Sequence, residues 1–249
     1  LYKTLDIKPV HNIDTIYKNW LEFKHQNNFL TTYNYVDWDI LKWLNEHSLF
    51  LQILSINTII SPILTILLPL VILLIPFILL KYQKINISFE KYYSILKLLL
   101  KRHPLGKLFS LQTVNIQEKA YGIATVGLFI VQIYQSVKSC ITFYFNMNSI
   151  FTTIKQLKLF LQKTNVLLET FIAKSSLYSS YQLFNTQLII EKEKITNIIK
   201  QLNTVNYSNI GEKFINMGSG LKQFYQLYND NNVKETIDYA IQFNGYLDH

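Results

Sequence analysis

The sequence predicts an all-α fold of long packed helices, in which one strongly apolar, proline-containing helix or hairpin is a candidate for insertion into a membrane. Hydrophobic residues make up 49% of the 249 residues and charged residues only 16%, whereas charged residues are about 25% of an ordinary soluble domain. The seven glycines and five prolines are too few to separate the short strands of a β-sandwich or barrel. We therefore expect helices whose surface is partly covered by something other than water.

Composition divides the chain into three regions. We expect N-terminal amphipathic helices in residues 1–48, an apolar helical region in residues 49–154, and a further amphipathic helical region in residues 155–249. Within the apolar region, residues 49–80 and 120–137 are the candidate membrane segments.

The first region contains a helical spacing of apolar residues. Tyr17, Trp20, Leu21 and Lys24 lie at positions i, i+3, i+4 and i+7, which predicts an amphipathic helix that begins near Asp14. The tryptophans of this region have two interpretations: packing in a core, or anchoring at a membrane surface.

A second helix is expected directly before the apolar region. Asp37 is a candidate N-cap, and Trp38, Leu41 and Leu44 follow it at helical spacing, so the helix should run to about Asn45.

The tract from residue 49 to residue 80 contains no Asp, Glu, Lys, Arg or His. Since about 20 apolar residues suffice to span a bilayer, the tract is long enough to do so. Pro62, Pro69 and Pro76 recur every seven residues; proline kinks a helix, but membrane helices tolerate it better than soluble ones. Three alternatives remain open: a kinked span, a re-entrant hairpin with both ends on one side, and a buried core helix of a soluble protein.

Basic residues follow this tract closely, which by the positive-inside tendency makes its carboxyl side cytoplasmic. Residues 89–102 place charged and apolar side chains on different helical faces, so they are expected to lie on a membrane surface or against a partner, or to pack an apolar face inward. The candidate residues for contact with an anionic surface are Lys91, Lys97, Lys101, Arg102 and Lys107.

The net charge of +8 comes almost entirely from lysine, because Arg102 is the single arginine. Lysine is a point charge rather than a bidentate reader of bases or phosphates. The excess therefore favours nonspecific attraction to anionic lipid or to the backbone of DNA. A coding bias toward Ile, Asn, Lys, Tyr and Phe would produce the same excess without any binding function.

The second apolar run, Ala120–Val137, is a weaker membrane candidate because it contains Gly122, Gly127, Gln132 and Gln135. If residues 49–80 enter lipid, this run is expected to pack beside them; otherwise both belong to a protein core.

The last region shows heptad-like spacing, which predicts long packed helices. Residues 203–211 are expected to form a loop and Gly218–Gly220 a turn. A short helix that begins near Leu221 is expected after the turn, and a last helix that begins near Val233 is expected after Asp230–Asn232. The residues at core spacing are Ile154, Leu157, Leu161, Leu168 and Phe171, interrupted at Thr164, and then Ile195, Ile198, Ile199 and Leu202.

Motifs for phosphate binding or catalysis are not evident. Gly106-Lys107 is followed by Leu108 and therefore does not form a Walker loop. Glu191 and Glu193 alternate with lysines, which indicates a solvated charged face rather than a pair of catalytic acids. Cys140 lies in an apolar run and is expected to be an inert buried thiol. We expect no catalytic, cofactor or metal site, and no enzyme activity, in these residues.

Five segments nevertheless form a familiar pattern: Ser61-Pro62 through Leu80, Gln117–Tyr121, Gln132–Gln135, Leu221–Tyr225 and Phe243–Asp248. Together they resemble the MutS-like ATPases that large DNA viruses encode, which are relatives of mismatch-repair proteins. The resemblance implies the helical core-and-lever region that precedes the ATPase domain, linking a part that contacts DNA or membrane to a downstream ATPase that would hold ATP and Mg. It also implies a homo-oligomer in a host cell, at a membrane or in the cytoplasm. Because the first residues do not resemble a secretory signal, we expect that the protein is not secreted. The alternative is a membrane anchor or scaffold without nucleotide chemistry.

Overall fold

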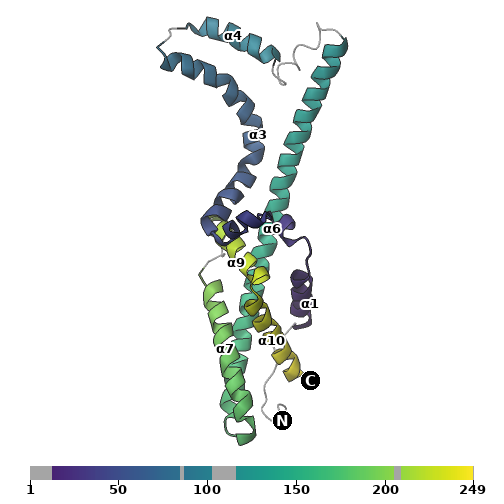
Figure 1. The fold of residues 1–249 in the computed structure, drawn as a ribbon, viewed down its shortest axis with the longest axis vertical. Coiled ribbons are helices and arrows are strands. Elements are labelled where there is room, and N and C mark those ends of the chain that lie inside the picture. Colours follow the sequence, from purple (N-terminus) through teal and green to yellow (C-terminus); the bar gives the residue numbers. More distant parts are fainter. Residues whose placement is uncertain (1–12, 85–86, 103–115, 205–208, 249) are drawn as a thin grey trace. The chain divides into compact units, whose positions relative to one another are not determined.

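The computed structural model describes residues 13–84, 87–102, 116–204 and 209–248, and it confirms the all-α prediction because no strand occurs in these ranges (Figure 1). Contacts within the chain define two compact units. Unit 1 contains the described residues of Leu1–Ser55 and Phe145–His249, and unit 2 contains those of Ile56–Tyr144. The helices are α1 (Ile13–Lys24), α2 (Phe29–Thr32), the 3₁₀ helix η2 (Asp39–Glu46), α3 (Ser48–Tyr82), α4 (Phe89–Arg102), α6 (Ile116–Ser175), the 3₁₀ helix η3 (Ser179–Tyr181), α7 (Gln182–Leu202), α8 (Ile210–Ile215), α9 (Met217–Asn229) and α10 (Asn231–Asp248).

Unit 1 is a helical bundle in which α7 lies alongside the C-terminal half of α6 (Figure 1) and α10 packs against α7. The heptad-like residues face inward, as predicted. Because apolar residues three and four positions apart share one face of a helix, they form a continuous stripe against neighbouring helices. The predicted stripe residues that are buried include Ile154, Leu157, Leu161, Leu168 and Phe171 on α6, and Ile195, Ile198, Ile199 and Leu202 on α7.

Two buried polar pairs interrupt this apolar interior. Thr164, where the heptad pattern breaks, receives a hydrogen bond of 2.8 Å from the amide of Asn244 on α10. Ser175 lies 2.7 Å from the amide oxygen of Asn185 on α7. Since each group has a partner, neither pair carries the free-energy cost of a buried unsatisfied group.

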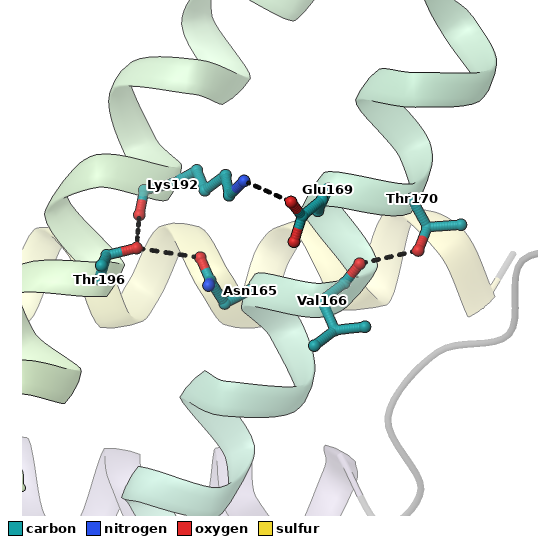
Figure 2. Close-up of polar contacts among 6 residues, drawn as sticks. All are labelled: Asn165, Val166, Glu169, Thr170, Lys192 and Thr196. Carbon is teal, nitrogen blue, oxygen red and sulfur yellow. Dashed lines mark hydrogen bonds and ion pairs between the residues drawn. The ribbon is translucent and has the colours of Figure 1, made fainter.

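The rim of the α6–α7 contact is polar (Figure 2). The side-chain oxygens of Asn165 and Thr196 are 3.2 Å apart, and Lys192 Nζ lies 3.3 Å from Glu169 Oε1. Glu191 departs from the solvated face expected of it: its side chain is buried and lies 2.8 Å from Lys194 Nζ. Burial raises the pKa of Tyr239 on α10, and the charge of Glu191 raises that pKa further.

Aromatic side chains join α1 and α2 to α9. Phe29 stacks on Tyr228 with ring centroids 3.8 Å apart, and Phe23 lies 4.9 Å from Phe224. The buried hydroxyl of Tyr35 donates a 2.7 Å hydrogen bond to the carbonyl oxygen of Leu221. Burial raises the pKa of Tyr35 well above its usual value. These contacts give the N-terminal helices a place in the core of unit 1.

The first predicted helix is confirmed as α1, but the second differs from its prediction. Residues 39–46 form the 3₁₀ helix η2, and Trp38 rather than Asp37 occupies its N-cap position without a side-chain hydrogen bond. The buried amide of Asn45 instead bonds both the N–H and the carbonyl oxygen of Val36, each at 2.9 Å. This side-chain bridge ties the end of η2 to the chain before it.

The glycines at 218 and 220 are helical rather than a turn, which corrects the prediction. The break lies at Asn216, between α8 and α9. A Cβ on Gly218 would come within 2.1 Å of the carbonyl oxygen of Ser48, and one on Gly220 within 2.5 Å of the Phe151 ring. The glycines therefore permit the start of α9 to approach α3 and α6 closely, a known use of residues that lack Cβ.

Candidate membrane-contacting region

The uncharged tract forms one continuous helix, α3, so the structure shows the helix rather than the hairpin alternative. The helix includes Pro62, Pro69 and Pro76 and is visibly curved (Figure 1), as expected because each proline removes a backbone donor. Pro62 has no N–H to donate to the carbonyl oxygen of Thr58, and Ser61 Oγ lies 3.0 Å from that oxygen. A hydroxyl thus replaces the missing donor, as serine and threonine do in membrane helices.

Apolar side chains are exposed over a wide arc of α3 in unit 2, and the remaining face, which carries Ser61, Thr65 and Pro69, is half-buried. Successive residues of a helix point about 100° apart, so the exposed run Ile66, Leu67 and Leu68 alone spans about 200°, more than half of the circumference. A helix with so wide an apolar surface belongs inside a large core or inside lipid. The exposed apolar residues of this segment include Ile60, Ile63, Leu64, Ile66, Leu67, Leu68, Val71, Ile72, Leu74, Ile75, Ile78 and Leu79.

The N-terminal half of α6 shares this character. Two stretches of the described chain are long and apolar enough to cross a membrane, Ser48–Pro69 and Ala120–Ser175. Only 11% of the first window and 6% of the second are buried inside the protein. The exposed apolar residues of α6 in unit 2 include Tyr121, Ile123, Leu128, Ile130, Val131, Tyr134 and Ile141.

Three hydroxyl groups connect α3 to α6 within unit 2, and we call Ser61, Thr65 and Ser136 the hydroxyl seam. Ser136 Oγ lies 3.0 Å from Ser61 Oγ and 3.3 Å from Thr65 Oγ1. Nearby, Cys140 is half-buried, with its Sγ 3.6 Å from the carbonyl oxygen of Ile59. Small hydroxyl residues that bond across closely packed helices are typical of helix pairs in membranes.

The predicted basic helix is confirmed as α4, and its position is partly fixed by an aromatic contact. Tyr92 is buried, and its ring centroid lies 4.4 Å from that of Phe77 on α3. Lys81 Nζ lies 5.6 Å from the same Phe77 ring, within the range of a cation–π contact. The end of α3 and the start of α4 therefore pack through one aromatic pair.

The predicted anionic-surface residues are only partly described. Lys91 and Lys97 are exposed on α4. Lys101 and Arg102 also belong to α4, but their side chains are outside the described part, and Lys107 lies outside the described residues altogether. The grouping of these five cations stays a prediction.

Sequence reasoning did not find the hydroxyl seam. Its signal was present, because Ser61 and Thr65 are four residues apart and so share a helix face, as do Ser136 and Cys140. What the sequence lacks is the pairing, which joins residues 75 positions apart.

Comparison of the chain with models of protein families, with curated proteins and with solved structures finds no match. The resemblance to MutS-like ATPases therefore stays a prediction.

Proposed function

We propose that this protein is a membrane-anchored helical scaffold. In this proposal α3 and the N-terminal half of α6 lie in lipid, and the bundle of unit 1 lies in water. The observation that carries the proposal is the exposure of apolar side chains over most of the surface of α3, from Ile60 to Leu79.

The size of the exposed surface supports lipid rather than water around α3. Full burial of one Leu or Ile side chain is worth about 1.5–3 kcal/mol, so the half-exposed chains of α3 leave on the order of 10 kcal/mol unrealised in water. The uncharged stretch also meets the length requirement of about 20 residues for a span. Lipid tails would cover the exposed apolar side chains of α3 without the need for a partner protein.

The hydroxyl seam supports the same proposal. In a bilayer, apolar faces of two helices gain little by meeting each other, because the lipid tails are equally apolar. Hydrogen bonds such as Ser136 to Ser61, at 3.0 Å, then become the contacts that select one helix pairing over another. The seam therefore gives α3 and α6 a defined register as a pair.

The test is extraction of the expressed full chain from membranes. We expect the protein to stay in the membrane pellet after washing with high salt and then with alkaline carbonate, because its attachment is apolar rather than ionic. A matched control replaces Leu64, Leu67 and Leu68 together with lysine, which should move the protein to the supernatant. Release of the unaltered chain by carbonate would contradict the proposal.

A second candidate function is the transmission module implied by the MutS-like resemblance. It is favoured by one observation: α3 and α6 each contribute residues to both units, so each helix is a covalent route for movement. The test is whether the complete gene encodes a Walker loop beyond His249, and whether its product hydrolyses ATP and forms a homo-oligomer. Any DNA contact through the lysines should weaken steeply with added salt.

A further inference from the structure

The strongest unexplained feature of unit 1 is a set of exposed apolar side chains at the start of α3. Two short helices contribute to it, η2 before α3 and α8 before α9. We call this set the root patch. Its members are Trp38, Ile40 and Trp43 in and beside η2, Leu49 and Ile53 on α3, and Ile210, Phe214 and Ile215 on α8, and all of them are exposed.

The members are held around the first two turns of α3. Gln52 donates a 3.0 Å hydrogen bond to the carbonyl oxygen of Phe214 on α8, and its side-chain oxygen accepts one of 2.7 Å from the N–H of Gly218. η2 packs against α9 and is separated from α3 only by His47, whose ring lies 5.3 Å from that of Trp43. Both short helices are thus tied to one segment, Ser48–Ser55.

The length of α3 places this segment at the edge of the lipid core if α3 spans. A helix of 35 residues is about 52 Å long at about 1.5 Å per residue, whereas the hydrocarbon core is about 30 Å thick. If the uncharged tract, residues 49–80, is centred in the bilayer, about 20 residues from its middle fill that core. Ile53 then lies about 17 Å from the bilayer centre, in the layer of lipid head groups, and Leu49 lies at the outer edge of that layer.

Tryptophan is the residue that favours this layer, because its ring is apolar and its N–H can still reach water. Trp38 and Trp43 are 74% and 56% exposed, in contrast to Trp20 at 5%. The patch does not present an unpaired cation at η2, because Lys42 forms an ion pair with Asp39 at 2.6 Å. The patch therefore suits an uncharged lipid interface rather than an acidic partner.

We infer that the root patch inserts into the interfacial layer of the bilayer, where the head groups meet the acyl chains, around the N-terminal end of α3. This inference rests on the proposed membrane anchor and adds to it a second kind of lipid contact. The patch fixes how far α3 enters the bilayer, since η2 and α8 cannot follow it into the acyl chains.

The test uses the full chain in phosphatidylcholine vesicles that contain lipids brominated at a shallow or a deep acyl position. One variant keeps Trp43 alone, with Trp20→Phe and Trp38→Phe. Two reporter variants lack all three native tryptophans and carry either Leu68→Trp in α3 or Leu183→Trp in α7. Leu183 is the matched control, because it is 90% exposed in unit 1 but belongs to no part of the root patch.

We expect the emission of Trp43 to shift to the blue and to be quenched more by shallow than by deep bromines. The emission of the Leu68→Trp reporter should be quenched more by deep than by shallow bromines. The emission of the Leu183→Trp reporter should not be quenched. Unquenched Trp43 beside a quenched Leu68→Trp reporter would overturn the root-patch inference and leave the membrane anchor standing. An unquenched Leu68→Trp reporter would overturn the anchor itself, and with it the inference. Quenching of Trp43 that requires added phosphatidylglycerol would contradict an uncharged interface.

Discussion

The two halves of α6 have the same backbone conformation but opposite surroundings. In unit 2, Leu128 and Ile130 are 72% and 60% exposed, whereas in unit 1 Leu161 and Leu168 are fully buried. The difference lies in the neighbours: the C-terminal half packs with α7 and α10, and the N-terminal half meets α3 at the hydroxyl seam. Helix formation therefore depends on the local sequence, whereas the burial of the helix depends on which other helices pack against it.

The polar contacts of the two units also differ in their surroundings. Unit 1 uses side-chain amides inside an apolar core, as in the 2.8 Å bond from Asn244 to Thr164. Unit 2 uses hydroxyl groups between two helices whose other faces are exposed, as in the 3.0 Å bond from Ser136 to Ser61. Substitutions in each unit test whether unit 1 depends on packing and whether the α3–α6 pair lies in lipid, as we propose.

The largest effect should come from a cavity in the bundle. Phe171 is 1% exposed and its ring lies 5.8 Å from those of Phe184 and Phe243. Phe171→Ala should lower the free energy of unfolding of unit 1 by about 3–5 kcal/mol, measured by urea denaturation in detergent micelles with the fluorescence of Trp20. The control is Leu183→Ala at an exposed site, which should change little. Equal effects of the two would show that the bundle is not tightly packed.

The next effect should appear in lipid. Leu68→Arg places a charge in the middle of the apolar tract and should raise the apparent free energy of membrane insertion by about 3 kcal/mol. Translation into microsomes, with the inserted fraction scored by glycosylation of engineered sites, measures this change. Leu183→Arg is the matched substitution in unit 1 and should leave insertion unchanged. If Leu68→Arg does not change the inserted fraction, α3 does not differ from unit 1 in its contact with lipid.

A smaller loss is expected from an unpaired buried hydroxyl. Asn244→Leu removes the partner of Thr164 and should lower the free energy of unfolding by about 1–3 kcal/mol, in the same urea experiment. Adding Thr164→Val should recover most of that loss, because no polar group then remains unsatisfied. Failure of the second substitution to compensate would mean that Asn244 acts through its shape rather than its hydrogen bond.

The smallest effect should come from the hydroxyl seam. Ser136→Ala leaves Ser61 and Thr65 with the backbone bonds of their own helix, so the loss should be about 0.6 kcal/mol, the average for hydrogen bonds between membrane helices. Unfolding in mixed micelles of a mild detergent and dodecyl sulfate measures it. Thr125→Ala serves as control, since the Thr125 hydroxyl bonds the carbonyl of Tyr121 on its own helix at 2.8 Å. If Ser136→Ala lowers the free energy of unfolding no more than Thr125→Ala does, the hydroxyl seam does not stabilise the α3–α6 pair.

Much of the fold could be predicted from the sequence because helix formation depends on residues three and four apart. The spacing of Ile154, Leu157 and Leu161 and the uncharged tract that became α3 are both visible without any partner. The candidate membrane surface follows from the same local information, since absence of charge and length are properties of a continuous segment.

The tertiary structure alone decided which side chains meet. It buried Glu191 among alternating charges, made Gly218 a point of close approach to Ser48, and exposed Trp43 while burying Trp20. These outcomes depend on segments far apart in the chain, so they follow from the packing of whole helices rather than from spacing within any one of them. Local hydrogen bonds and apolar periodicity determine the helices, and only nonlocal burial determines their contacts.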